Sequence, residues 1–187
     1  VDQIICSSYA KSINYKDNLN LNGHISFVDV GFNKTSIISY FNDKILSLDV
    51  LPIGGNHITK DISKILKIDL ESSEQKKRNF NQDPKLLNNE DTSTVTLQKI
   101  IFARTEEIFE LCAKSIDSNS YKLGKPKLVL MGEGSKILAN QYKDEISFSN
   151  DIDFLEETSQ DICHSGFKFI SGLNKQEVVV VPKIQTK

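Results

Sequence analysis

The chain has 187 residues, of which 39% are hydrophobic and 26% charged, a composition that suits a folded domain with its own core and excludes a disordered or fibrous protein. Lys and Arg number 23 against 25 Asp and Glu, so the net charge is -2 and both signs are interspersed. No nucleic-acid partner is expected, because such binding needs a concentrated basic face. The cysteines Cys6, Cys112 and Cys163 form no CxxC pair, which argues against a zinc site or a disulfide framework and predicts reduced thiols.

Three β-type runs are predicted at His24–Val30, Thr35–Phe41 and Ile45–Leu51. Only the turn sequences GFNK and NDK separate them. Breaks this short predict an antiparallel meander, because parallel strands need long crossovers. Pro52 ends the third strand, and a Gly-Gly pair then leads into a helix from about His57 to Leu66, with Asn56 as its expected cap.

After Leu66 the chain turns polar, and residues 67–96 predict a charged helix, a loop and a short strand. A long amphipathic helix from Leu97 to Ser118 follows, then the strand-turn-helix sequence LVLMGEGSKIL, and finally a helix at Ser159–Leu173. The strand-turn-helix unit favours a parallel crossover. We therefore predict an α/β domain with a mixed sheet and an inserted small lobe.

Three glycine-containing turns suggest a phosphate site. Asp29 precedes Gly31 at the first hairpin turn, where backbone N–H groups can meet phosphate oxygens and a carboxylate can hold Mg²⁺ or its waters. The sequence GEGS at Gly132–Ser135 and the pair Gly54-Gly55 both stand just before predicted helices, whose N-termini favour anions. Each turn alone is typical of an ordinary loop; their order and spacing together favour a nucleotide site.

The stretch VDVGFNKTSIISYFNDKILSLDVLPIGGNHITKDI resembles the second half of the actin-like ATPases, and among them the FtsA family of bacterial cell-division proteins. Asp29-Val30-Gly31 matches the second phosphate motif, and PIGGNHITKDI follows the family pattern almost to the letter. LESSEQKK resembles the helix with an adenine-contacting Glu-x-x-Lys, ARTEEIFELCAKSI the long helix, and LVLMGEGSKI the adenosine motif.

The resemblance implies the actin-like (ribonuclease H-like) fold. Residues 1–66 and 97–187 would form a core like subdomain IIA, and residues 67–96, with or without parts of the flanking helices, an inserted lobe like IIB. The only methionine is Met131, so Val1 is not a natural start, and we expect a piece of a longer protein whose N-terminal domain is absent here. The C-terminal sequence EVVVVPKIQTK has no helical alternation, so no membrane anchor is expected in this chain.

The implied cofactors are ATP and Mg²⁺, with Asp29 as the residue that meets the metal. The implied nucleotide contacts are Asp29, Gly31, Asn33, Lys34, Thr35, Gly54, Gly55, Glu74, Lys77, Gly132, Gly134 and Ser135. No catalytic residue is assigned, because the family's catalytic acid lies in the first domain. Two departures from the pattern, Phe32 in place of a glycine and the negative Glu133 in the adenosine motif, predict weak or absent hydrolysis.

The resemblance further implies a protein that links the FtsZ ring to the membrane and the divisome, at the inner face of the cell membrane at the division site. The lobe would receive the C-terminal peptide of FtsZ between about Lys67 and Lys114, helped by the basic run Lys76-Lys77-Arg78. Self-association into filaments is also implied.

Two alternative functions remain open on the sequence alone. One is a scaffold of the PilM type for pilus assembly, in which bound nucleotide orders an interaction surface. The other is a sugar kinase of the same superfamily, which PIGGNHITKDI makes less favoured because this motif is of the division-protein type.

Overall fold

The computed structural model describes residues 4–16, 22–82, 91–120, 122–136, 149, 151–156 and 159–173. The chain divides into two compact units, one of Val1–Leu19 with Thr158–Lys187 and one of Asn20–Glu157. Among the helices in these described ranges, none combines the length and the apolar character needed to cross a membrane.

The smaller unit is a pair of helices, α1 (Ser7–Lys16) and α6 (Ser159–Leu173). The rings of Tyr9 and Phe169 meet edge to face, with centroids 5.8 Å apart. Lys168 Nζ donates a hydrogen bond to Asn14 Oδ1 at 3.3 Å. The predicted last helix is therefore confirmed, and its partner is the first helix of the chain.

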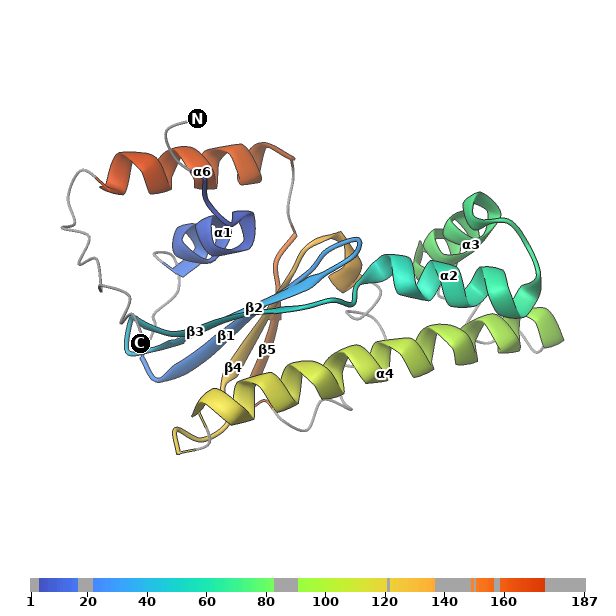
Figure 1. Cartoon of the computed structure of the whole chain (residues 1–187), viewed down its shortest axis with the longest axis horizontal. Helices are drawn as coiled ribbons and strands as arrows, with labels where there is room; N and C mark the ends of the chain where they lie inside the picture. Colours follow the sequence, from blue (N-terminus) through green and yellow to red (C-terminus); the bar gives the residue numbers. More distant parts are fainter. Residues whose placement is uncertain are drawn as a thin grey trace, which may run out of the picture. The chain divides into compact units, whose positions relative to one another are not determined.

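The larger unit contains a five-stranded mixed sheet in the order β3-β2-β1-β4-β5 (Figure 1). Its strands are β1 (His24–Val30), β2 (Thr35–Phe41), β3 (Lys44–Leu51), β4 (Lys127–Met131) and β5 (Asp151–Phe154). Strands β1 to β3 form the predicted antiparallel meander, and β4 is parallel to both β1 and β5. The β2–β3 turn places Asn42 and Asp43 at positive φ, which short polar side chains tolerate best.

The helices described beside this sheet are α2 (Gly55–Leu66), α3 (Leu70–Gln82) and α4 (Thr92–Ser120). The short strand predicted before Leu97 is wrong, because α4 already begins at Thr92. The amides of Thr94 and Val95 donate to the side chain and the carbonyl of Asp91, respectively. This capping at the first turn outweighs the β-propensity of the TSTVT sequence.

Helix α4 is shared by two hydrophobic clusters. Its C-terminal half packs on the sheet, and its N-terminal half packs on α2 and α3, beyond the sheet (Figure 1). The sheet cluster consists of Val28, Val30, Ile37, Ile53, Ile108, Phe109, Cys112, Ile116, Leu128, Leu130 and Ile152. We call α2, α3 and the N-terminal half of α4 the lobe. The lobe cluster consists of Ile58, Ile62, Phe80, Leu97, Ile100 and Ile101.

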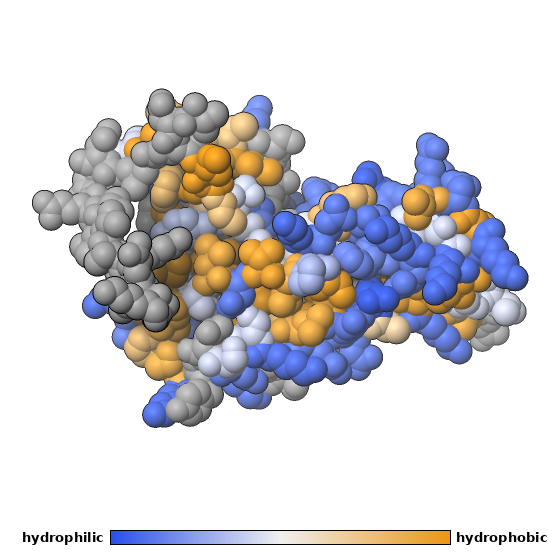
Figure 2. All heavy atoms as spheres, in the orientation of Figure 1, coloured by the Kyte–Doolittle hydropathy of each residue, from blue (hydrophilic) through white to orange (hydrophobic). Residues whose placement is uncertain are grey.

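The lobe thus has its own apolar centre under a surface that Figure 2 shows as mostly hydrophilic with a few hydrophobic patches. The polar sequence of α3 therefore covers a small apolar core through Phe80. Within the sheet cluster, burial raises the pKa of the Cys112 thiol to about 12, so this cysteine acts as a packing residue.

We expect Ile101→Ala to lower the free energy of unfolding by about 2–4 kcal/mol, because the side chain is fully buried in the lobe cluster. Urea denaturation of the purified chain measures this loss. Lys99→Ala, an exposed position two residues earlier on the same helix, is the control and should change stability by less than about 0.5 kcal/mol. Equal effects of the two substitutions would contradict the existence of the lobe cluster.

Candidate functional site

The carboxyl ends of the parallel strands β1 and β4 meet at one edge of the sheet, where ligands of open α/β sheets bind. Asp29, 8% exposed, pairs in register with Met131, and Gly132 follows directly. A Cβ on Gly132 would lie 2.3 Å from Asp29 Oδ1, and a Cβ on Gly134 would lie 2.7 Å from the carbonyl oxygen of Val30. Only glycines allow the turn after β4 to lie this close to the end of β1.

The first turn of α2 is bonded to the β1–β2 turn. The amide of Gly55 donates to the carbonyl of Gly31 at 3.0 Å, and the amide of Asn56 donates to the carbonyl of Phe32 at 2.7 Å. A Cβ on Gly54 would lie 2.5 Å from that same Gly31 oxygen. Two amides that a helix N-terminus usually leaves for solvent or a ligand are therefore used to hold the turn.

We call the set Gly31, Gly54, Gly55, Gly132 and Gly134 the glycine junction. It brings the three turns predicted from the sequence together in space around the carboxyl end of β1. The same contacts give Gly54, Gly132 and Gly134 a structural reason to be glycine, whereas a Cβ on Gly55 would make only ordinary van der Waals contacts. Their presence alone is therefore no measure of nucleotide binding.

Asn56 does not cap α2 as the sequence suggested. Gly54 is the N-cap residue. The start of the helix lies so close to the β1–β2 turn that a side chain at this position would overlap the turn. Asn56 lies inside the first turn, and its Nδ2 donates to Asn33 Oδ1 at 2.9 Å. This contact is a further link between helix and turn.

The predicted turn residues differ in exposure. Asn33 and Lys34 are exposed at the tip, and Phe32 is 63% exposed, so its ring does not fill the inside of the turn. Thr35 is fully buried, and its hydroxyl donates to the carbonyl of Ile53 at 2.7 Å. Thr35 therefore fixes the turn to the segment before α2.

The turn after β4 closes on itself. The backbone amide and the hydroxyl of Ser135 both donate to the carbonyl of Gly132, at 3.0 Å and 2.6 Å. Residues Glu133–Ser135 form a single 3₁₀ turn, and Gly132 before it has φ of 86°. Glu133 is the first residue of this turn, and its exposed side chain pairs with Lys136.

Glu74 and Lys77 form a network between α3 and α2. Lys77, 5% exposed, donates to Glu74 Oε2 at 2.6 Å, to Thr59 Oγ1 at 2.7 Å and to the carbonyl of Gly55 at 3.1 Å. Glu74 Oε1 accepts from Arg78 Nε at 2.9 Å. Burial raises the pKa of Glu74, but the hydrogen bonds from Lys77, Thr59 and Arg78 outweigh it and lower the pKa to about 2.

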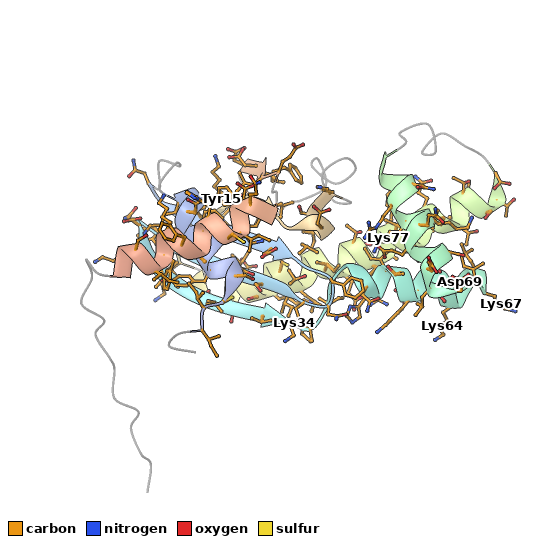
Figure 3. The ribbon with its side chains drawn as sticks, turned by 90° about the horizontal axis from the view of Figure 1, so that it is seen from above. Tyr15, Lys34, Lys64, Lys67, Asp69 and Lys77 are labelled. Atoms are coloured by element: carbon orange, nitrogen blue, oxygen red, sulfur yellow. The ribbon has the colours of Figure 1, made fainter. Side chains whose placement is uncertain are left out.

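This network corrects one prediction. The run Lys76-Lys77-Arg78 does not form a continuous basic surface, because Lys77 points inward to α2 while its two neighbours are exposed (Figure 3). The sequence could not show this, since a Glu and a Lys three residues apart on a polar helix usually lie on a solvated face.

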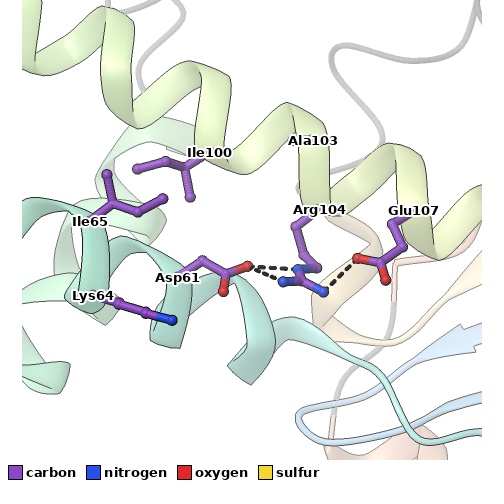
Figure 4. A pocket seen from close by; sticks show the side chains of 7 residues that line it. All are labelled: Asp61, Lys64, Ile65, Ile100, Ala103, Arg104 and Glu107. Carbon is purple, nitrogen blue, oxygen red and sulfur yellow. Dashed lines mark hydrogen bonds and ion pairs between the residues drawn. The ribbon is translucent and has the colours of Figure 1, made fainter.

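A pocket of about 460 Å³ lies between α2 and α4 in the lobe (Figure 4). Asp61, Lys64, Ile65, Ile100, Ala103, Arg104 and Glu107 line it. Arg104 donates to Asp61 at 2.6 Å and to Glu107 at 2.5 Å, so its guanidinium bridges both helices. Sequence analysis missed this pocket, although one signal existed: this lysine-rich chain uses arginine only twice, at Arg78 and Arg104.

The fold defines an actin-like protein. The chain superposes on a chain of a PilM–PilN type IV pilus biogenesis complex with a TM-score of 0.66 and 19% identity, covering 92% of this chain and 51% of the other. For MreB 5 of Spiroplasma citri bound to AMPPNP, the TM-score is 0.65 with 14% identity, covering 90% and 59%. These likenesses confirm the predicted actin-like ATPase fold.

The sequence identifies the family within this class. The family model for cell division protein FtsA matches residues 26–159, and the chain belongs to this family. It is 30% identical to the FtsA of Bacillus subtilis (strain 168) over 118 residues, which are 55% of this chain and 26% of that protein. With FtsA of Neisseria meningitidis serogroup B the identity is 32% over 121 residues, 57% of this chain and 28% of the relative.

The aligned part of this chain thus spans only about a quarter of the length of these two curated relatives. Among the three functions left open by the sequence, the family match favours the division protein over the pilus scaffold and the sugar kinase.

We expect Gly132→Ala to cost about 1–3 kcal/mol more than Gly124→Ala in the free energy of unfolding. Both glycines have positive φ, 86° and 79°, so both substitutions strain the backbone. Only at Gly132 would the new Cβ also meet Asp29 Oδ1, since nothing lies within 4 Å at Gly124. Urea titrations of the two variants measure the difference, and equal losses would contradict the close packing of this turn on β1.

Glu74 should make the free energy of unfolding depend on pH between about pH 2 and 4.5. Its pKa in the folded chain is about 2 against 4.5 in the unfolded chain, so its contribution is complete above pH 4.5 and is lost as the pH falls toward 2. Glu74→Gln should therefore flatten the decline in unfolding free energy in this window. Glu106→Gln, an exposed position on α4, is the control and should leave the wild-type slope in place. Identical slopes for wild type and Glu74→Gln would contradict the network.

Proposed function

We propose that this chain is the second domain of an FtsA-type division protein and binds Mg²⁺-ATP at the carboxyl edge of the sheet, facing a first domain. The observation that carries the proposal is the position of Asp29, a carboxylate at the end of a parallel strand beside a turn that only glycine can form. One carboxylate together with phosphate oxygens and waters is a usual Mg²⁺ environment in nucleotide sites. A protein of the same fold, MreB 5 of Spiroplasma citri, binds AMPPNP, which supports a nucleotide as the ligand.

The residues present fit these groups. Asp29 would hold the magnesium or its waters, and the bound magnesium would neutralise phosphate charge. Exposed Lys34 and Asn33 stand on the β1–β2 turn, where a cation and an amide suit phosphate oxygens. Gly132, Gly134 and Ser135 provide the close backbone approach on the other side of Asp29. We assign no catalytic role to any of the described residues, and the proposal is nucleotide binding with weak or absent hydrolysis.

Mg²⁺-ATP added to the isotope-labelled chain should shift the NMR amide signals of residues 31–35 and 132–135. We expect weak binding by this chain alone, because a nucleotide held on one side remains largely in the high dielectric of water, where each charge contact is worth about 1 kcal/mol. Asp29→Asn should abolish the dependence of these shifts on Mg²⁺, while Asp117→Asn, exposed on α4, should not.

Two results would contradict this proposal. Chemical-shift changes centred on other residues would place the nucleotide elsewhere. Micromolar affinity of the chain alone would mean that the site is complete within these residues.

The lobe is proposed as the site for the C-terminal peptide of FtsZ, and through it for a link between the FtsZ ring, the membrane and the divisome at the inner face of the division site. Arg104 and exposed Lys64 at the pocket suit acidic groups of a peptide, and Ile65 and Ile100 suit its apolar side chains. Self-association into filaments would use other surfaces of the longer protein.

Ile65→Ser should weaken binding of an FtsZ C-terminal peptide about tenfold, because Ile65 is 54% exposed and its apolar surface is available to a partner. Fluorescence anisotropy with a labelled peptide measures the affinity, which should also fall with added salt. Leu70→Ser, at a similarly exposed leucine outside the pocket, is the matched control and should bind as the wild type. Equal loss in both variants, or no binding at all, would contradict this surface.

A further inference from the structure

Lys77 has used all of its hydrogen-bonding capacity within the protein. An ammonium carries three N–H donors, and Lys77 directs them to Gly55, Thr59 and Glu74. The side chain is 5% exposed, so water does not compete for these bonds. A contact with an adenine ring would require Lys77 to give up one of these partners.

One of these partners leads directly to the β1–β2 turn. The carbonyl of Gly55 and the amide of Asn56 belong to the same rigid, planar peptide group. Its carbonyl oxygen accepts from Lys77 at 3.1 Å, and its N–H donates to the carbonyl of Phe32 at 2.7 Å. The two bonds hold one peptide plane from opposite sides.

Charge strengthens this connection. A cation on the carbonyl oxygen polarises the peptide group and makes its N–H a stronger donor. The space around Gly55 agrees with the bridge, because a Cβ there would lie 3.7 Å from Lys77 Nζ and 3.8 Å from the oxygen of Gly31. Lys77 on α3 is thus linked to the turn through a single intervening peptide of α2.

We propose that Lys77 is a positioning residue, which through the Gly55–Asn56 peptide holds the β1–β2 turn in place and couples the lobe to that turn. The resemblance to the family had implied an adenine contact for this lysine. Under the proposed function, the coupling would make phosphate binding at the turn sensitive to the position of α3, and the reverse. The bridge itself rests only on the geometry of the chain without ligand.

The direct test is amide hydrogen exchange of the ligand-free chain by NMR. Lys77→Met should raise the exchange rate of the Asn56 amide about tenfold and shift the amide signals of residues 31–34, while the amide of Val28 in β1 keeps its protection. Lys76→Met, the exposed neighbour on the same helix, is the matched control and should change neither. Changes confined to α3 would overturn the proposal, as would an equal loss of protection over the whole sheet.

The unsubstituted chain gives a test that does not depend on a variant folding. Its Lys77 ammonium should show a slowly exchanging proton signal, with a cross-peak to the α protons of Gly55, since a Cβ position there lies 3.7 Å from Nζ. A rapidly exchanging ammonium at low temperature would overturn the proposal.

A nucleotide experiment separates a positioning role from base contact. For a positioning residue, Lys77→Met should weaken Mg²⁺-ATP and inorganic tripolyphosphate by the same factor, about tenfold. A loss for ATP alone would assign Lys77 to the adenine and overturn the inference. If wild type binds neither compound, the proposed nucleotide function fails, and the ligand-free exchange rates still decide the role of Lys77.

Discussion

The arrangement of the larger unit depends on two hydrogen bonds, from the amides of Gly55 and Asn56 to the carbonyls of Gly31 and Phe32. They attach the first turn of α2 to the β1–β2 turn. The bonds require Gly54, since any Cβ there would overlap the Gly31 oxygen. Because the helix leads into the lobe and the turn adjoins Asp29, this attachment joins the sheet edge to the lobe.

Helix α4 provides the second connection between the same two regions. Its C-terminal half belongs to the sheet core and its N-terminal half to the lobe core, so the lobe is supported by one continuous helix and by the bonded start of α2. The candidate nucleotide edge and the lobe pocket are therefore parts of one connected unit. Under the proposed function, this gives a physical route by which a nucleotide and a partner peptide would influence one another.

Sequence patterns were sufficient for the elements whose chemistry is local. The meander was predicted from short turns such as Asn42-Asp43. The three glycine turns were predicted from the order and spacing in which they follow one another in the sequence. Tertiary contacts decided the failures. Gly54, not Asn56, is the cap of α2, because the helix begins against the carbonyl oxygen of Gly31. Lys77 is buried only because α3 packs on α2. The lobe pocket joins Asp61 and Arg104, which are distant in sequence, so no local pattern reveals it.

The proposed nucleotide site is tested most directly by locating the metal ion that would accompany ATP. Mn²⁺ supplied with ATP in place of Mg²⁺ broadens the NMR signals of nearby nuclei. If Asp29 holds the metal, the strongest broadening falls at the amides of residues 29–35 and 132–135 and is lost in Asp29→Asn. Broadening centred on the lobe pocket or on Asp151 and Asp153 of β5, or broadening that persists equally without ATP, would contradict it.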